Sequence, residues 1–227
     1  QEARRQRQMC IRDRYWDIQL PMSEAIETAK KYGAFSGSIM IEGIESAERH
    51  GLQCKIITSS LSELKKIIDS GIPPIVLLPG IPEITQHASI ITGYSDEENT
   101  IFHYVQKGTQ EGEQQEGVIP QNIFDDEWSE EGRLVIILAP SEILSKLILE
   151  NISSDQSNRL CFAAERYNIL QNPGKALESL RRALEISPGN SVALHLMGTM
   201  LSTQNSSDCI NLFEQSLESN KRSYLSY

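Results

Sequence analysis

Residues 71 to 94 constrain the fold more than any other stretch, because they place two apolar segments in succession with a short break between them. Their sequence is GIPPIVLLPGIPEITQHASIITGY. Short apolar runs bounded by glycine and proline are typical of buried strands. We therefore predict a strand over Pro74 to Leu78, a loop, and a second strand over His87 to Tyr94. A histidine that opens a buried strand is also well placed to act as a general base.

The residues before this stretch alternate signals that start and stop helices. Ser23 is a suitable N-cap and Gly33 a suitable terminator for a first helix. Ser60 with Glu63 forms a capping box for a later one. The predicted elements are a helix from Ser23 to Gly33, a helix from Met40 to Gly51, a strand over Leu52 to Ile57 and a helix over Leu61 to Asp69.

After Tyr94 the pattern changes to strands. The acidic segment 95–99 is a tight turn between the His87 strand and a strand over Thr100 to Gln106, which favours antiparallel pairing. The polar segment KGTQEGEQQEG is expected to be a loop. Phe124 and Trp128 then lie one helical turn apart on a short helix, before a last strand over Arg133 to Ala139. Helices followed by a mostly antiparallel sheet predict an α+β fold.

Composition excludes several classes of protein. The chain has 227 residues, 39% of them hydrophobic and 23% charged, which is ordinary for a globular protein. Its longest apolar runs are far shorter than the roughly 20 residues that span a bilayer, so we predict no transmembrane segment. The net charge of -10 argues against nucleic-acid binding, which needs clustered lysine and arginine.

The four cysteines, Cys10, Cys54, Cys161 and Cys209, are far apart and contain no C-x-x-C pair. This spacing suggests neither a zinc site nor a disulfide framework, and we predict no metal and no cofactor. Residues 1 to 14, QEARRQRQMCIRDR, are basic and show no apolar periodicity. We expect them to be disordered or non-native, because the segment MCIRDR resembles translated adapter sequence and the chain begins with Gln.

Several segments follow one another in this order: "GL", SLSELKKIIDSGIPPIVLL, HASIITGY, F-x-x-x-W and a final strand ending in "AP". Together they resemble the papain-like cysteine peptidase domain of the bacteriocin-processing, double-glycine leader family. The resemblance covers roughly residues 15 to 140. It implies that His87 occupies the position of the catalytic histidine. In such an enzyme a cysteine thiolate attacks the peptide carbonyl, and the imidazole takes the thiol proton and later protonates the leaving amine.

The chain departs from the family pattern at two places. The stretch 101–105, where the family carries the residue that orients the imidazole, has no carboxylate and offers only His103 and Tyr104 as polar side chains. The helix that carries the nucleophilic cysteine is expected to be missing, and Cys10 lacks the apolar helix that should follow an active-site cysteine. We therefore expect this chain to be an inactive fragment of a longer, bacterial enzyme.

The remainder of the chain is expected to be helical. Residues 141–157 are expected to form a connector, with a helix from Glu142 to Asn151 and the polar linker SSDQSN. About two tetratricopeptide (TPR) repeats follow over 158–227. Counting back from Pro188 puts the packing positions of a 34-residue repeat at Leu160, Ala164, Tyr167, Ala176, Leu180 and Ala183. A second, degenerate copy has Leu194, Gly198, Leu201, Cys209, Phe213 and Ser216. Such repeats form a groove for a peptide or partner protein, or else brace the neighbouring domain.

Two functions remain open. The chain is either part of a cysteine peptidase with a peptide or protein substrate and a TPR tail, or a non-catalytic papain-like domain that binds proteins together with the TPR repeats. The resemblance implies a bacterial protein, cytoplasmic or associated with the cell envelope. It leaves open the substrate and the identity of the third catalytic residue.

Overall fold

The computed structural model describes residues 16, 21, 23–24, 27–28, 31, 40–79, 86–106 and 114–223, with the backbone alone at 86, 87, 105, 106, 114 and 115. The predicted helix from Ser23 to Gly33 and Cys10 therefore fall wholly or largely outside the described residues. The described elements are α3 (Met40–Arg49), β1 (Gln53–Thr58), α4 (Leu61–Asp69), β2 (Ile75–Pro79), β3 (Gln86–Ser95), β4 (Thr100–Gln106), β5 (Gln114–Pro120), α5 (Gln121–Glu130), β6 (Leu134–Ala139), α6 (Ser141–Leu144), α7 (Ser154–Ile169), α8 (Pro173–Ile186), α9 (Ser191–Ser202) and α10 (Asp208–Ser219).

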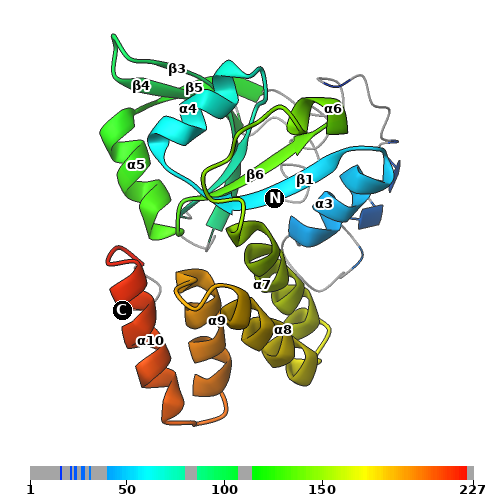
Figure 1. Cartoon of the computed structure of the whole chain (residues 1–227), viewed down its shortest axis with the longest axis vertical. Coiled ribbons are helices and arrows are strands. Elements are labelled where there is room, and N and C mark those ends of the chain that lie inside the picture. Colours follow the sequence, from blue (N-terminus) through cyan, green and yellow to red (C-terminus); the bar gives the residue numbers. More distant parts are fainter. Residues whose placement is uncertain are drawn as a thin grey trace.

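The strands form one antiparallel sheet in the order β1-β6-β2-β3-β4-β5. Consecutive strands from β2 to β5 are neighbours, as short turns require. The last strand, β6, is inserted between β1 and β2, a long-range pairing that no local pattern predicts. The chain is thus α+β, as expected from the order of its elements (Figure 1).

Both faces of the sheet are buried, because successive side chains of a strand point to opposite faces. On β6, Leu134, Ile136 and Leu138 pack with apolar residues of α3. The intervening residues of β6 pack on the opposite face with apolar residues of α4, α5 and α6. The central strands consequently have nearly continuous apolar sequences, which explains why β2 and β6 are the clearest strand signals in the chain.

The helix α4 begins and ends where its sequence predicts. The Ser60 hydroxyl accepts a hydrogen bond from the Glu63 backbone N–H at 3.2 Å, and Gly71 ends the turn after the helix with a φ of 74°. Only half of the predicted capping box forms. The Glu63 carboxylate instead accepts hydrogen bonds from the Ser59 hydroxyl at 2.7 Å and from the Glu150 N–H at 2.6 Å.

Three predicted segments differ from the structure. Part of the expected loop KGTQEGEQQEG belongs to β5, which begins at Gln114. The expected connector helix from Glu142 to Asn151 is only the short α6, followed by turns. The polar residues SSDQSN, expected to be a linker, contain the first turns of α7, which begins at Ser154. Ser154, Asp155 and Asn158 make polar contacts with β1 that hold the start of the helix there.

The helices α7 to α10 form two helical hairpins that lie together beside the sheet (Figure 1). The predicted packing residues Ala164, Ala176, Leu180 and Ala183 are buried between these helices, with Leu160 and Tyr167 partly buried against them. Gly198 lies where α9 and α10 approach closely, because a Cβ atom there would be 2.7 Å from Cε1 of Phe213. The helical tail is therefore packed as two pairs of closely spaced helices.

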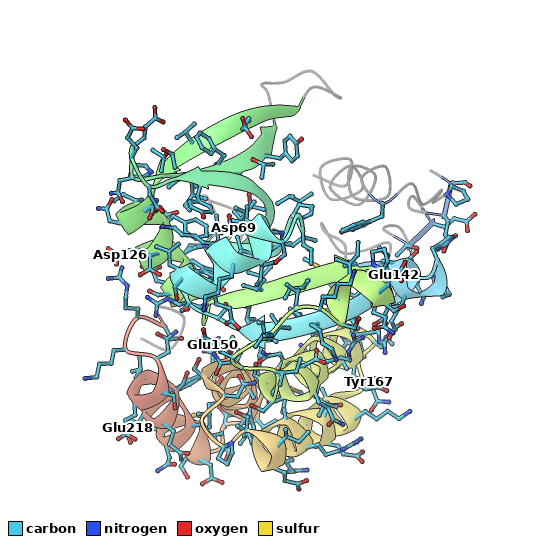
Figure 2. The ribbon with its side chains drawn as sticks, turned by 45° about the horizontal axis from the view of Figure 1, so that its top comes forward. Asp69, Asp126, Glu142, Glu150, Tyr167 and Glu218 are labelled. Carbon is cyan, nitrogen blue, oxygen red and sulfur yellow. The ribbon has the colours of Figure 1, made fainter. Side chains whose placement is uncertain are left out.

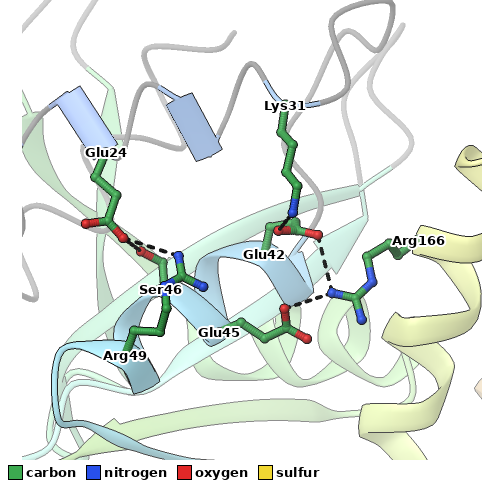
Figure 3. Close-up of polar contacts among 7 residues, drawn as sticks. All are labelled: Glu24, Lys31, Glu42, Glu45, Ser46, Arg49 and Arg166. Atoms are coloured by element: carbon green, nitrogen blue, oxygen red, sulfur yellow. Dashed lines mark hydrogen bonds and ion pairs between the residues drawn. The ribbon is translucent and has the colours of Figure 1, made fainter.

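The helical tail also packs on the sheet domain. Phe162 of α7 is buried in the core beneath α3 and β1, and the Asn220 amide after α10 donates to the Ser129 carbonyl of α5 at 2.8 Å. Ion pairs from α3 add to this contact, since Glu42 and Glu45 both bind Arg166 of α7 (Figure 3). The sequence left open whether the hairpins brace the domain, and in the structure they contact it.

Candidate functional site

The hairpin of β2 and β3 places the predicted catalytic histidine. His87 is the second residue of β3 and pairs with Leu78, the next-to-last residue of β2. The position is at the end of the hairpin that faces residues 80–85, which lie outside the described part of the chain. Both strands have the predicted course, so His87 does open a strand whose interior, from Ala88 to Ile91, is buried.

The next polar residues along the hairpin form a buried pair. Ser89 lies two residues after His87 on β3, and its hydroxyl oxygen is 2.8 Å from Nδ1 of His103 on β4. Ser89 is 1% exposed and His103 is 7% exposed. The Ser89 hydroxyl thus contacts one side of the His103 ring, within the stretch 101–105 that contains no carboxylate.

Tyr94, at the end of the HASIITGY motif, connects the C-terminal end of β3 to α4. Its hydroxyl donates to the Asp69 carboxylate, 2.9 Å from Oδ1 and 3.0 Å from Oδ2. The Lys65 ammonium lies 5.0 Å from the centre of the Tyr94 ring. The hydrogen bond to Asp69 raises the pKa of Tyr94 above its ordinary value. Tyr94 therefore serves as an anchor between two elements.

Phe124 and Trp128 lie on α5 as the F-x-x-x-W spacing predicts. Both side chains are fully buried, with ring centres 5.4 Å apart. The Trp128 indole N–H donates to the Leu134 carbonyl at 3.0 Å, at the first residue of β6. The motif therefore locks α5 onto the sheet and shapes the core, and its contribution to any site is indirect.

Cys54 is too far along the sheet to act with His87. It lies on β1, separated from β3 by β6 and β2, which is a lateral distance of roughly 14 Å at normal strand spacing. Cys54 is also displaced from His87 along the strands. Cys54 pairs with Leu138 of β6, whereas Leu78, the partner of His87, lies level with residue 133 of β6. The displacement is therefore about five residues, or roughly 17 Å.

The other described cysteines belong to the helical tail. Cys161 is 2% exposed in the core between the helices, and burial raises the pKa of its thiol well above the ordinary value. A thiol in such surroundings is a poor nucleophile. Cys209 lies on α10. No described cysteine is therefore positioned as the partner of His87, and Cys10 lies outside the described residues.

Two further histidines, His50 and His195, lie in helical surroundings. His50 follows α3, and its Nδ1 lies 2.9 Å from the Ser46 carbonyl oxygen while its Nε2 lies 3.2 Å from the Glu24 carboxylate. His195 lies within α9 with its ring centre 5.8 Å from that of Phe213. Burial lowers the pKa of His195, which favours its neutral form.

The sequence predicted a strand that begins near His87, but it missed the polar contacts further along that strand. Nothing in the local pattern indicates that Ser89 meets His103, because the contact depends on the register between β3 and β4, which includes an irregularity between Ile91 and Gly93. The same holds for Tyr94 and Asp69. Of these residues, only Ser89 could have been singled out from the sequence, because it is a polar residue within an apolar part of the strand.

Within the described ranges, no three histidine, cysteine, aspartate or glutamate side chains gather as metal ligands. None of the described helices is both long and apolar enough to span a membrane. No protein-family model matches the chain. No curated protein matches it either.

Proposed function

We propose that the sheet domain is a papain-like cysteine peptidase domain of the bacteriocin-processing type, with His87 as its general base, and that the helical tail consists of TPR repeats. The single observation that carries the proposal is the place of His87 at the start of β3, in a hairpin with β2. That hairpin follows α4 and the Gly71 turn, and precedes α5 with its buried aromatic pair. The order agrees with the sequence motifs of the family.

In the proposed reaction, the imidazole of His87 accepts the proton of a cysteine thiol, and the thiolate sulfur bonds to the carbonyl carbon of the substrate. The same imidazole then donates this proton to the amine as the peptide C–N bond breaks and the amine leaves, and water hydrolyses the thioester that remains on the enzyme. The nucleophile would be a cysteine other than Cys54, Cys161 and Cys209, because their positions or their protonation do not suit the step. Cys10 lacks the apolar helix that should follow an active-site cysteine, so we expect no peptide hydrolysis by the chain of 227 residues.

The alternative proposal is a non-catalytic papain-like domain that acts with the helical hairpins as a protein-binding scaffold. Two observations favour it. The described cysteines do not lie beside His87, and the stretch 101–105, whose His103 ring contacts the Ser89 hydroxyl, contains no carboxylate. A scaffold would keep the fold and the strand position of His87 without any need for an activated thiol.

Labelling with a peptidyl vinyl sulfone, applied to the longest chain that the gene encodes, distinguishes the two functions. The peptidase proposal expects labelling at one cysteine that is none of Cys54, Cys161 and Cys209. His87→Ala should abolish this labelling. The matched control His50→Ala should retain it, because the described polar contacts of the His50 ring are with Ser46 and Glu24 at the helix end. Absence of labelling, or labelling that persists in His87→Ala, would favour the scaffold.

A further inference from the structure

The strand β1 forms one edge of the sheet and pairs with β6 on its inner side. An open edge strand presents backbone N–H and C=O groups that can pair with a strand of another chain. Here the outer side of β1 faces α7, as Figure 2 also shows. The contact is between side chains of a helix and the backbone of a strand, and it has a specific geometry.

Three residues from the first turns of α7 bind the outer edge of β1, and we call Ser154, Asp155 and Asn158 the strand clamp. The Ile56 N–H donates to Oδ1 of Asp155 at 2.8 Å, and the Ile56 carbonyl accepts from Nδ2 of Asn158 at 3.0 Å. The Thr58 N–H donates to the Ser154 hydroxyl at 3.0 Å. These side chains therefore supply the hydrogen bonds that a further strand would otherwise make.

The strand clamp is fixed from both hairpins of the helical tail. The Asn190 amide donates to Oδ1 of Asn158 at 2.8 Å, which leaves the Asn158 amide nitrogen to face Ile56. Oδ1 of Asn190 in turn accepts from the backbone N–H groups of Val192 and Ala193 at the start of α9. The second oxygen of Asp155 pairs with Lys55 at 2.9 Å. The clamp is thus part of a connected polar network.

The outward backbone groups of β1 can pair with the same groups of a second copy of the strand. Both the N–H and the C=O of Ile56 point outward, as required of a residue that exchanges two hydrogen bonds with its partner in an antiparallel ladder. Two copies of β1 related by a two-fold axis can therefore pair through Ile56. In that register Lys55 lies opposite Ile57 of the second copy, so the pairing brings no like charges directly opposite each other.

We propose that β1 is a masked strand-addition site, and that the strand clamp prevents β1 from pairing with β1 of a second copy of this chain. The helical tail then has a role within its own chain, since the surface of α7 that carries Asn158 and Phe162 is occupied by the sheet. This inference does not depend on a peptidase function. It rests on the contacts between α7 and β1 alone.

The test uses the full chain with Asp155→Ala and Asn158→Ala combined, followed by amide hydrogen exchange and light scattering after size-exclusion chromatography. At a dilution where the variant is monomeric, we expect exchange at the Ile56 amide to accelerate by about tenfold or more, as the loss of one or two hydrogen bonds implies. At higher concentration we expect the variant to dimerise. Asp208→Asn is the matched control, because Asp208 occupies the first turn of α10. It should remain monomeric with slow exchange at Ile56.

Addition of Thr58→Pro to the double variant tests whether the dimer forms through β1. Proline removes the outward N–H of Thr58 and obstructs an incoming strand, so the protein should return to a monomer while exchange at Ile56 stays fast. A dimer that persists with Thr58→Pro would overturn the proposal. So would a double variant that stays monomeric with Ile56 as protected as in Asp208→Asn.

Should the double variant fail to fold, Ser154→Ala provides a milder test, because it removes a single hydroxyl. We expect faster exchange confined to the Thr58 amide. An unchanged rate at Thr58 would show that the clamp does not hold the strand, and would contradict the proposal.

Discussion

Gly198 illustrates how a single residue sets the spacing of two helices. A Cβ atom at this position would lie 2.7 Å from Cε1 and 2.9 Å from Cδ1 of Phe213, both well inside van der Waals contact. Gly198→Ala should therefore destabilise the protein by about 1–3 kcal/mol through overpacking, measured by urea denaturation. Adding Phe213→Leu should recover part of the loss, because the shorter side chain makes room.

Gly174→Ala is the control for this prediction. Gly174 is the second residue of α8, and a Cβ atom there would meet only Oδ1 of Asn172, at 4.0 Å. Alanine in that helix should be neutral or stabilising by up to about 1 kcal/mol. Equal effects of the two alanine substitutions would mean that helix propensity, and not the contact with Phe213, decides the outcome.

His195 should make stability depend on pH. Burial lowers its pKa in the folded protein, so below the unfolded value near 6.5 the unfolded chain binds more protons than the folded one. The contribution of neutral His195 is therefore fully present above about pH 6.5 and lost as the pH falls through its folded pKa. Urea denaturation from pH 8 to pH 5 should show this loss, and His195→Gln should flatten it. A His195→Gln profile parallel to that of the wild type would contradict the assignment.

Among the helices and strands, the sequence predicted most accurately those whose ends are set by residues nearby in the chain. The bounds of α4 and β4 agree with the prediction residue for residue, because caps, glycine terminators and alternation act over a few positions. The edge strand β5 was missed because its first half, residues 114–117, has no apolar side chain and Val118 is 56% exposed, so it shows no alternating apolar pattern. Pro120 lacks an N–H, and such a residue is tolerated at an edge.

The attachment of α7 should depend on burial more than on charge. Phe162 is 4% exposed within the sheet core, so Phe162→Ala should cost about 3–5 kcal/mol in the free energy of unfolding. Arg159 forms a two-point ion pair with Glu48 in which both side chains are about a third exposed. Arg159→Ala should therefore cost only about 0–1 kcal/mol. Guanidinium denaturation of the two variants measures both values, and a larger effect for Arg159 would reverse the ranking.

At the scale of the whole molecule, the candidate site could be located from the sequence only up to the strand that carries His87. The insertion of β6 between β1 and β2 joins segments about 60 to 80 residues apart, and it decides that Cys54 lies far from His87. The contacts that fix α7 on β1 join segments about 100 residues apart. Neither contact has a local signature, because each depends on the packing of the complete fold.

This shared packing predicts that the sheet domain and the helical tail unfold together. Phe162 belongs to the core of the sheet, and Asn220 binds Ser129 at the opposite end of the tail. The four longest described helices lie in the tail, whereas Trp16 and Trp128 both lie outside it. Far-ultraviolet circular dichroism and tryptophan fluorescence should therefore report coincident transitions in urea. Phe162→Ala should shift both by the same amount, whereas a fluorescence midpoint that stays fixed while the helical signal moves would show that the two parts unfold independently.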